Sequence, residues 1–164
     1  MTNPIPAGFT SLTPHVTVTD AGAALDFYTK AFGAEEVFRM HGPDGQSVMY
    51  AEMNVGNAKL MLAAENPGMP ACKAPVNLGG HSVTLTLYVP DCDKAIERAV
   101  AAGAELKMPG MDMFWGDRYG LVADQWGHCW AIATHTADLT PDEIEKAKNE
   151  FFARMAAGGG ECGA

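Results

Sequence analysis

The stretch that decides the fold is Val18-Thr19-Asp20-Ala21-Gly22-Ala23-Ala24-Leu25, and it returns in altered form as Val89-Pro90-Asp91-Cys92-Asp93-Lys94-Ala95-Ile96. Both copies follow the pattern Val-x-Asp-x-x-x-Ala-[Leu/Ile], at an offset of 71 residues. The correspondence continues where Gly33-Ala34-Glu35 matches Gly103-Ala104-Glu105 and Val55-Gly56 matches Trp126-Gly127. Because matches at nearly one offset indicate a repeated supersecondary unit, the sequence predicts one structural module used twice.

Each module is expected to contain a strand, a helix and three further strands. Polar and β-branched residues alternate over 13–18 and over 83–89, which predicts half-buried strands. Asp20 and Asp91 are well placed to cap the helices that follow. Later strands are expected at 35–40, 48–55 and 58–64 in the first module, and at 105–108, 119–123 and 129–134 in the second.

The expected fold class is α+β, with two tandem βαβββ modules forming a curved, cup-like sheet and a C-terminal helix added at the end. Thr140 and Glu143 form a capping box at the start of that helix. The predicted organisation is an extended lead-in at 1–12, the first module at 13–65, an inter-module loop at 66–80, the second module at 81–136, and the C-terminal helix with a flexible tail at 137–164.

Composition restricts the possible partners. The formal net charge of -9 argues against nucleic acid or an anionic membrane surface, because both require a cationic protein surface. No run of 18 apolar residues and no secretory signal is present, so a membrane span is not expected. The four cysteines show no metal-ligand spacing, which favours reduced thiols and a cytoplasmic protein.

Three further segments carry a resemblance to a known family. They are Asp26-Phe27-Tyr28-x-x-Ala31-Phe32-Gly33-Ala34, the run from Asp112 to Gly120, and Asp124-x-x-Gly127-His128-x-Trp130. With Val18-x-Asp20, they make residues 12–135 resemble the vicinal oxygen chelate superfamily, in its glyoxalase/bleomycin-resistance group and nearest the PhnB-like branch. The resemblance implies a small-molecule site inside the cup and a two-fold homodimer.

The resemblance also implies where metal ligands would lie. Metal-dependent members of the family place histidine on the first strand of each module and glutamate on the last, four residues after a turn glycine. By that count the positions are Thr13, Thr84, Leu60 and Ala131, so the usual set is absent and no metal ligand is assigned. The cofactor stays unknown, and a divalent metal is possible only through a rearranged set such as His15 with Glu52.

His15 and Glu52 are the catalytic candidates. His15 lies on the polar face of the first strand, and histidine is the residue type most often used as a general base near neutral pH. Glu52 lies in the middle of the strand at 48–55. The alternative is that His15 is a hydrogen-bonded lining residue and Glu52 a solvent-facing strand carboxylate.

The candidate ligand-binding residues lie in the second module. Aromatic rings provide apolar walls, and an arginine provides a planar fork of donors for a carboxylate or phosphate. Alternatively, Asp117 pairs with Arg118 to brace a loop while the rings fill the core. The ligand-binding candidates are Thr84, Thr86, Tyr88, Trp115, Arg118 and Tyr119.

Two classes of function remain open. The first is a small-molecule binder without turnover, in which the cup holds a small and possibly anionic organic ligand. The second is a metal-dependent lyase, isomerase or dioxygenase with a rearranged His/Glu site. The missing carboxylates favour the binder, and fold alone does not decide between them.

Overall fold

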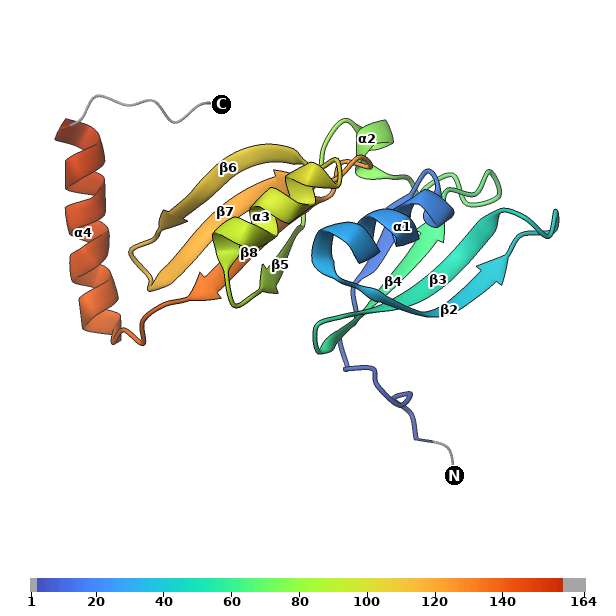
Figure 1. Ribbon diagram of the computed structural model, residues 1–164, viewed down its shortest axis with the longest axis horizontal. Helices are drawn as coiled ribbons and strands as arrows, with labels where there is room; N and C mark the ends of the chain where they lie inside the picture. Colours follow the sequence, from blue (N-terminus) through green and yellow to red (C-terminus); the bar gives the residue numbers. More distant parts are fainter. Residues whose placement is uncertain (1–2, 158–164) are drawn as a thin grey trace.

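The computed structural model describes residues 3–157, and its two four-stranded sheets have the same strand order (Figure 1). The first sheet has the order β1-β4-β3-β2 and the second has β5-β8-β7-β6. β1 pairs with β4, and β5 with β8, in parallel, and the other pairs are antiparallel. This identity of order confirms the repeated module. The strands are β1 (His15–Val18), β2 (Glu35–His41), β3 (Val48–Val55), β4 (Ala58–Ala64), β5 (Thr84–Tyr88), β6 (Glu105–Asp112), β7 (Asp117–Ala123) and β8 (Cys129–His135).

One helix covers one face of each sheet. α1 (Ala21–Phe32) belongs to the first module and α3 (Cys92–Ala101) to the second, and the two helices lie side by side in Figure 1. The side chains of Asp20 and Asp91 accept hydrogen bonds from the backbone N–H groups of Ala23 and Lys94, as N-caps do. We call the sheet face away from the helix the open face.

A buried carboxylate joins the two modules. Asp124, in the turn between β7 and β8, accepts hydrogen bonds from the Tyr28 hydroxyl at 2.8 Å and from Trp130 Nε1 at 3.0 Å. Its other oxygen accepts from the backbone N–H groups of Trp126 and His128. The rings of Tyr28 and Trp130 also contact each other, with centroids 5.3 Å apart. Two of the three family segments therefore meet at the module junction, which accounts for the residue types found there.

Strand alternation decides which side chains reach each open face. Val16 and Val18 are buried in the core, whereas His15 and Thr17 point the other way. In the second module β6 extends to Asp112 and β7 begins at Asp117, so both strands are longer than the sequence predicted. The connection between them is a short turn, because Met113 N–H donates to the carbonyl of Asp117.

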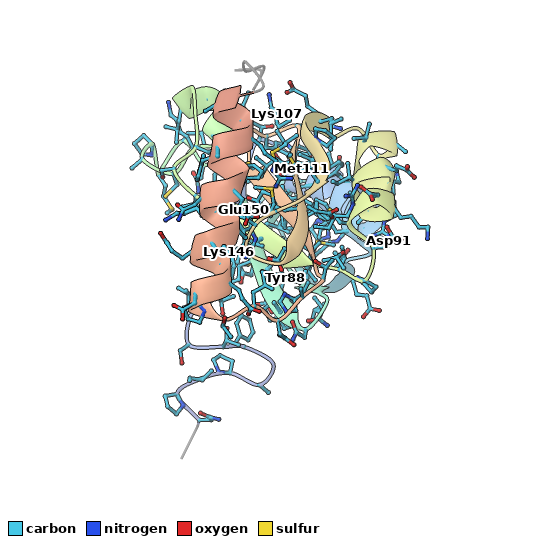
Figure 2. The ribbon with its side chains drawn as sticks, turned by 90° about the vertical axis from the view of Figure 1, so that its left-hand side faces the viewer. Tyr88, Asp91, Lys107, Met111, Lys146 and Glu150 are labelled. Carbon is cyan, nitrogen blue, oxygen red and sulfur yellow. The ribbon has the colours of Figure 1, made fainter. Side chains whose placement is uncertain are left out.

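The segments outside the modules also contain helices. The inter-module loop includes the short helix α2 (Pro75–Leu78), which the sequence did not predict. The expected C-terminal helix is present as α4 (Pro141–Ala157), and the capping box forms between Thr140 and Glu143. Figure 2 shows Lys146 and Glu150 on α4, far from Asp91 at the start of α3. The predicted tail lies outside the described residues, and no helix within residues 3–157 could span a membrane.

Candidate functional site

A cavity of about 410 Å³ opens between the edge strands β1 and β5. Its wall carries one lysine, Lys73, and three histidines, namely His15, His81 and His128. No carboxylate side chain from residues 3–157 lines it, although the chain as a whole has a formal net charge of -9. The complete lining is Pro14, His15, Val16, Thr17, Lys73, Pro75, Leu78, Gly80, His81, Ser82, Val83, Leu85 and His128.

Hydrogen bonds hold the walls of this cavity in place. Glu65 Oε1 accepts from the Ala74 backbone N–H and from Asn77 Nδ2, both at 2.8 Å, and these bonds hold the pKa of Glu65 below its ordinary value. His128 Nε2 lies 2.9 Å from the carbonyl oxygen of Thr17, which ties the β7–β8 turn to β1. The loop that carries Lys73 and His81 is therefore anchored to the first module.

A second hollow of about 640 Å³ lies beside the start of β8. Thr84 and its cross-strand partner Cys129 line it, together with Lys107 on β6. His81 lines both hollows and stands between them. Of the sequence-predicted ligand-binding residues, Thr84 is the one that lies at this hollow.

The structure places the two catalytic candidates on the open face of the first sheet. His15 is opposite Met61 on β4, and Met61 is opposite Glu52 on β3, so the three side chains form one row. Tyr50, which the sequence analysis missed, joins them: its hydroxyl donates to Glu52 Oε1 at 3.1 Å, and its ring centroid is 5.8 Å from that of His15. Partial burial, and then the bond to Glu52, raise the pKa of Tyr50 to about 12. Tyr50 and Glu52 are two residues apart in one strand and therefore share a face, and this spacing was the feature of the sequence that could have predicted their contact.

The expected metal-ligand positions need one correction. Leu60, predicted at the glutamate position of the first module, is buried in the core opposite Met53, and Met61 is the residue opposite His15. Counting four residues from the turn glycine does not reach the same face in both modules, because the turns differ in length. Gly56 and Asn57 alone separate β3 from β4, whereas residues 124–128 separate β7 from β8. In the second module Ala131 is opposite Thr86, so neither the residue opposite His15 nor the residue opposite Thr86 is a carboxylate. Nor do any three His, Cys, Asp or Glu side chains within residues 3–157 form a metal-binding group.

A polar cluster that the sequence did not reveal surrounds Asp117. This buried carboxylate accepts hydrogen bonds from the Tyr88 hydroxyl at 2.9 Å and from Trp115 Nε1 at 3.1 Å. Its other oxygen lies 2.8 Å from Nδ1 of His135, whose Nε2 is 3.0 Å from Asp138. Burial raises the pKa of Asp117, but the hydrogen bonds from His135, Tyr88 and Trp115 outweigh it and lower that pKa below its ordinary value. The bonds to Asp138 and Asp117 raise the pKa of His135.

The prediction that Arg118 lies with Trp115 and Tyr119 was wrong, because Arg118 is on the other face of the sheet. Residues 117–119 belong to β7 and alternate between its faces, so Arg118 points to the side of α3. There it donates to Asp93 of α3, at 2.6 Å from Nε and 3.1 Å from Nη2, and also contacts Asp112. These bonds raise the pKa of Arg118 further above its ordinary value. Arg118 therefore braces α3 against the sheet, and its partner is Asp93 rather than the expected Asp117.

The other predicted ligand-binding residues remain on the open face of the second sheet. Thr86 and Tyr88 are exposed along β5, and the rings of Trp115 and Tyr119 pack edge to face with centroids 5.6 Å apart. The structure thus brings the sequence-predicted residues into two groups, one on each open face, with Arg118 in neither.

Comparison with known proteins agrees with this architecture. The family model described as Glyoxalase/Bleomycin resistance protein/Dioxygenase superfamily matches residues 10–132. An uncharacterized protein of Mycobacterium tuberculosis is 42% identical over 139 residues, which cover 84% of this chain and 81% of that protein. An uncharacterized protein of Mycobacterium bovis is likewise 42% identical, over 84% of this chain and 91% of its own length.

Solved structures extend the comparison to the fold. TioX from Micromonospora sp. ML1 is 27% identical with a TM-score of 0.59, covering 80% of this chain and 100% of that one. A glyoxalase/bleomycin resistance protein/dioxygenase from Nocardioides has the same TM-score of 0.59 at 24% identity, covering 85% of this chain and 90% of that one. The repeated βαβββ module, the residues at its junction and the family match lead to one conclusion: this chain belongs to the glyoxalase/bleomycin resistance protein/dioxygenase superfamily.

Proposed function

We propose that the protein binds a small organic acid in the cavity between β1 and β5 and does not depend on the usual metal ligands of its family. The single observation that carries the proposal is the charge of the cavity wall. Lys73 lines it together with His15 and His81, and no carboxylate side chain of the described residues does, in a chain that is otherwise strongly acidic. The Lys73 ammonium group in a concave site attracts an anion, and the surrounding Pro75, Leu78 and Leu85 suit an apolar body.

The metal-dependent alternative has less support. His15 and Glu52 share one face but are separated by Met61, and the strand spacing puts their backbones roughly 10 Å apart. The positions opposite His15 and Thr86 are Met61 and Ala131, which offer no oxygen ligand. Binding without turnover therefore accounts for the residues better than lyase, isomerase or dioxygenase chemistry.

Three finer predictions belong to the same proposal. We place the chain in the PhnB-like branch, on the residues of its family segments, and in the cytoplasm, on its cysteine pattern. We also propose a homodimer, because β2 and β6 are outer edge strands with unpaired backbone groups, and such edges are normally covered. Sedimentation of a 17.4 kDa species at micromolar concentration would contradict the dimer.

A ligand screen with a charge-removing variant tests the proposed function. Small aliphatic and aromatic carboxylic acids are titrated into the protein by calorimetry, with their methyl esters as neutral controls. Lys73→Met should weaken the bound acid by about tenfold or more, since it removes one charge-assisted bond. Lys146→Met, at an exposed position on α4 (Figure 2), is the matched control and should leave the affinity unchanged. The proposal fails if acids and esters bind alike, or if both variants behave as the wild type.

A further inference from the structure

The short helix α2 contacts both modules, although it belongs to the loop that connects them. Figure 1 shows it between the two sheets. A helix of four residues has little stability of its own, because the first turn of a helix is costly to form. The position of α2 is therefore set by its contacts with the two modules. We call residues 74–78, which are α2 and the residue before it, the clasp.

The first module holds the clasp through Glu65. The Glu65 N–H donates to the Val18 carbonyl at 2.8 Å, which ties Glu65 to the end of β1. The carboxylate accepts from the Ala74 N–H and from Asn77 Nδ2, both at 2.8 Å, and so reaches both ends of the clasp. Ala74 is completely buried, and Lys73 directly precedes it. One carboxylate therefore fixes the backbone next to the lysine of the acid cavity.

The second module holds the clasp through the turn before β8. The Val76 N–H donates to the Trp126 carbonyl at 2.9 Å, and Trp126 is itself buried. Gly127 follows with a φ of +86°, and a Cβ atom placed on it would lie 2.8 Å from the Val76 nitrogen and 3.2 Å from Pro75 Cβ. The first of these distances is shorter than a Cβ atom tolerates. The clasp therefore reaches its position because residue 127 has no side chain.

The internal repeat separates this contact from the ordinary role of a turn glycine. Gly56 occupies the equivalent turn of the first module, with a φ of +59°, and a Cβ atom placed on it would meet nothing within 4 Å. Both turns favour glycine because of their left-handed backbone conformation. At Gly127, but not at Gly56, the glycine also makes room for a helix.

We propose that Glu65 and Gly127 are positioning residues, which hold the clasp across the module junction and thereby set Lys73 at the acid cavity. When either contact is lost, the short helix leaves both modules, and Lys73 is no longer held in place. The effect on ligand binding rests on the proposed organic-acid site, whereas the clasp itself is a property of the ligand-free protein. The apparent affinity falls with the fraction of molecules in the binding-competent state.

Amide hydrogen exchange in the full-length, ligand-free protein tests the clasp. The Ala74 N–H reports the contact with the first module, and the Val76 N–H reports the contact with the second. Glu65→Ala should reduce the protection of both amides by about ten- to a hundredfold, since it removes charge-assisted bonds and frees the clasp as a unit. Gly127→Ala should also expose both amides, although the Ala74 N–H is bonded to the first module.

Gly56→Ala is the matched control for Gly127→Ala. It adds the same methyl group at a left-handed glycine of the equivalent turn, where the added group meets no neighbour. Both reporter amides should therefore stay as protected as in the wild type. Melting curves verify that each variant is folded. If Gly127→Ala does not fold, the effect of Glu65→Ala on the Val76 amide decides the test.

Calorimetry with phenylacetate, and with methyl phenylacetate as the neutral control, tests the consequence for Lys73. Glu65→Ala and Gly127→Ala should each weaken phenylacetate about threefold or more, and Gly56→Ala should leave its affinity unchanged. Glu65→Ala combined with Lys73→Met should weaken it by less than the product of the two single losses. The reason is that Glu65 acts through Lys73, and residues that act through each other are not additive.

Defined results overturn the inference. The clasp is refuted if Glu65→Ala leaves the Val76 amide protected, or if Gly56→Ala and Gly127→Ala have the same effect on both amides. The positioning role is refuted if the amides lose protection while phenylacetate binds as before, or if the losses for Glu65→Ala and Lys73→Met multiply in full. A wild type that binds none of the screened acids contradicts the proposed function, and the exchange results still decide the clasp.

Discussion

Replacing Tyr28 by phenylalanine tests whether the Asp124 carboxylate holds the two modules together. Tyr28 is completely buried, and its hydroxyl donates to Asp124 Oδ2 at 2.8 Å. Asp124 is 6% exposed and receives three other hydrogen bonds, from Trp130 Nε1 and from the backbone of Trp126 and His128. Burial, and then the neighbouring Asp124, raise the pKa of Tyr28 well above 10.0, so the hydroxyl keeps its proton throughout the assay.

The expected loss follows from the type of bond. A hydrogen bond to a charged group contributes about 1.5–3 kcal/mol, and Phe fills the same space apart from the hydroxyl. Oδ2 of Asp124 keeps its bond from Trp130, so the expected loss for Tyr28→Phe lies near the middle of this range, about 2 kcal/mol. For a chain of this size each kcal/mol lowers the melting temperature by about 2–4 °C, so a fall of about 4–8 °C is expected.

Urea unfolding measures this loss directly. The midpoint should fall while the slope of free energy against urea stays constant, since the folded chain exposes the same surface. Tyr119→Phe is the matched control, because within residues 3–157 the Tyr119 hydroxyl makes no side-chain hydrogen bond, and it should unfold within about 0.5 kcal/mol of the wild type. If Tyr28→Phe also unfolds at the wild-type midpoint, the Tyr28–Asp124 bond does not stabilise the module junction and the reasoning is refuted.

Two further predictions concern the second module. Arg118→Met should lower the melting temperature, because Asp93 of α3 loses its partner. It should leave the affinity for an organic acid, measured by calorimetry, unchanged. A loss of affinity without a fall in melting temperature would contradict the observed geometry. The raised pKa of His135 gives stability that is fully present below its unfolded-state value of about 6.5 and is lost as the pH rises through its higher folded-state value. The urea midpoint of the wild type should therefore fall relative to that of His135→Gln as the pH is raised from about 6 to about 9. If the midpoints of the two proteins change in parallel with pH, the contacts of His135 to Asp117 and Asp138 contribute nothing to stability.

The sequence carried most of the architecture because its signals are local. The N-caps Asp20 and Asp91, the glycine that ends α1, and the alternation of 13–18 and 83–89 each act within a few residues. The 71-residue repeat then related the two modules, and the common strand order confirmed it. The capping box at Thr140 located the start of α4 in the same way.

Strand boundaries limited what could be said about the candidate site. A strand places successive side chains on opposite faces, so one residue decides which face a side chain reaches. The sequence did not show that β7 begins at Asp117, and Arg118 was consequently assigned to the wrong face. The different turns before β4 and β8 misplaced Leu60 by one residue for the same reason.

By itself, the sequence determined the repeated βαβββ module, the family and the polar face that carries His15, because these depend on periodicity and on residue types at fixed spacing. Only the tertiary structure decided that Lys73 and His81 meet His15 in one cavity, that Tyr50 and Phe38 surround Glu52, and that Asp117 rather than Arg118 interacts with Tyr88. These contacts join residues from different strands and loops, and their geometry is set by sheet register and module packing. Neither is recorded in the local pattern of the chain.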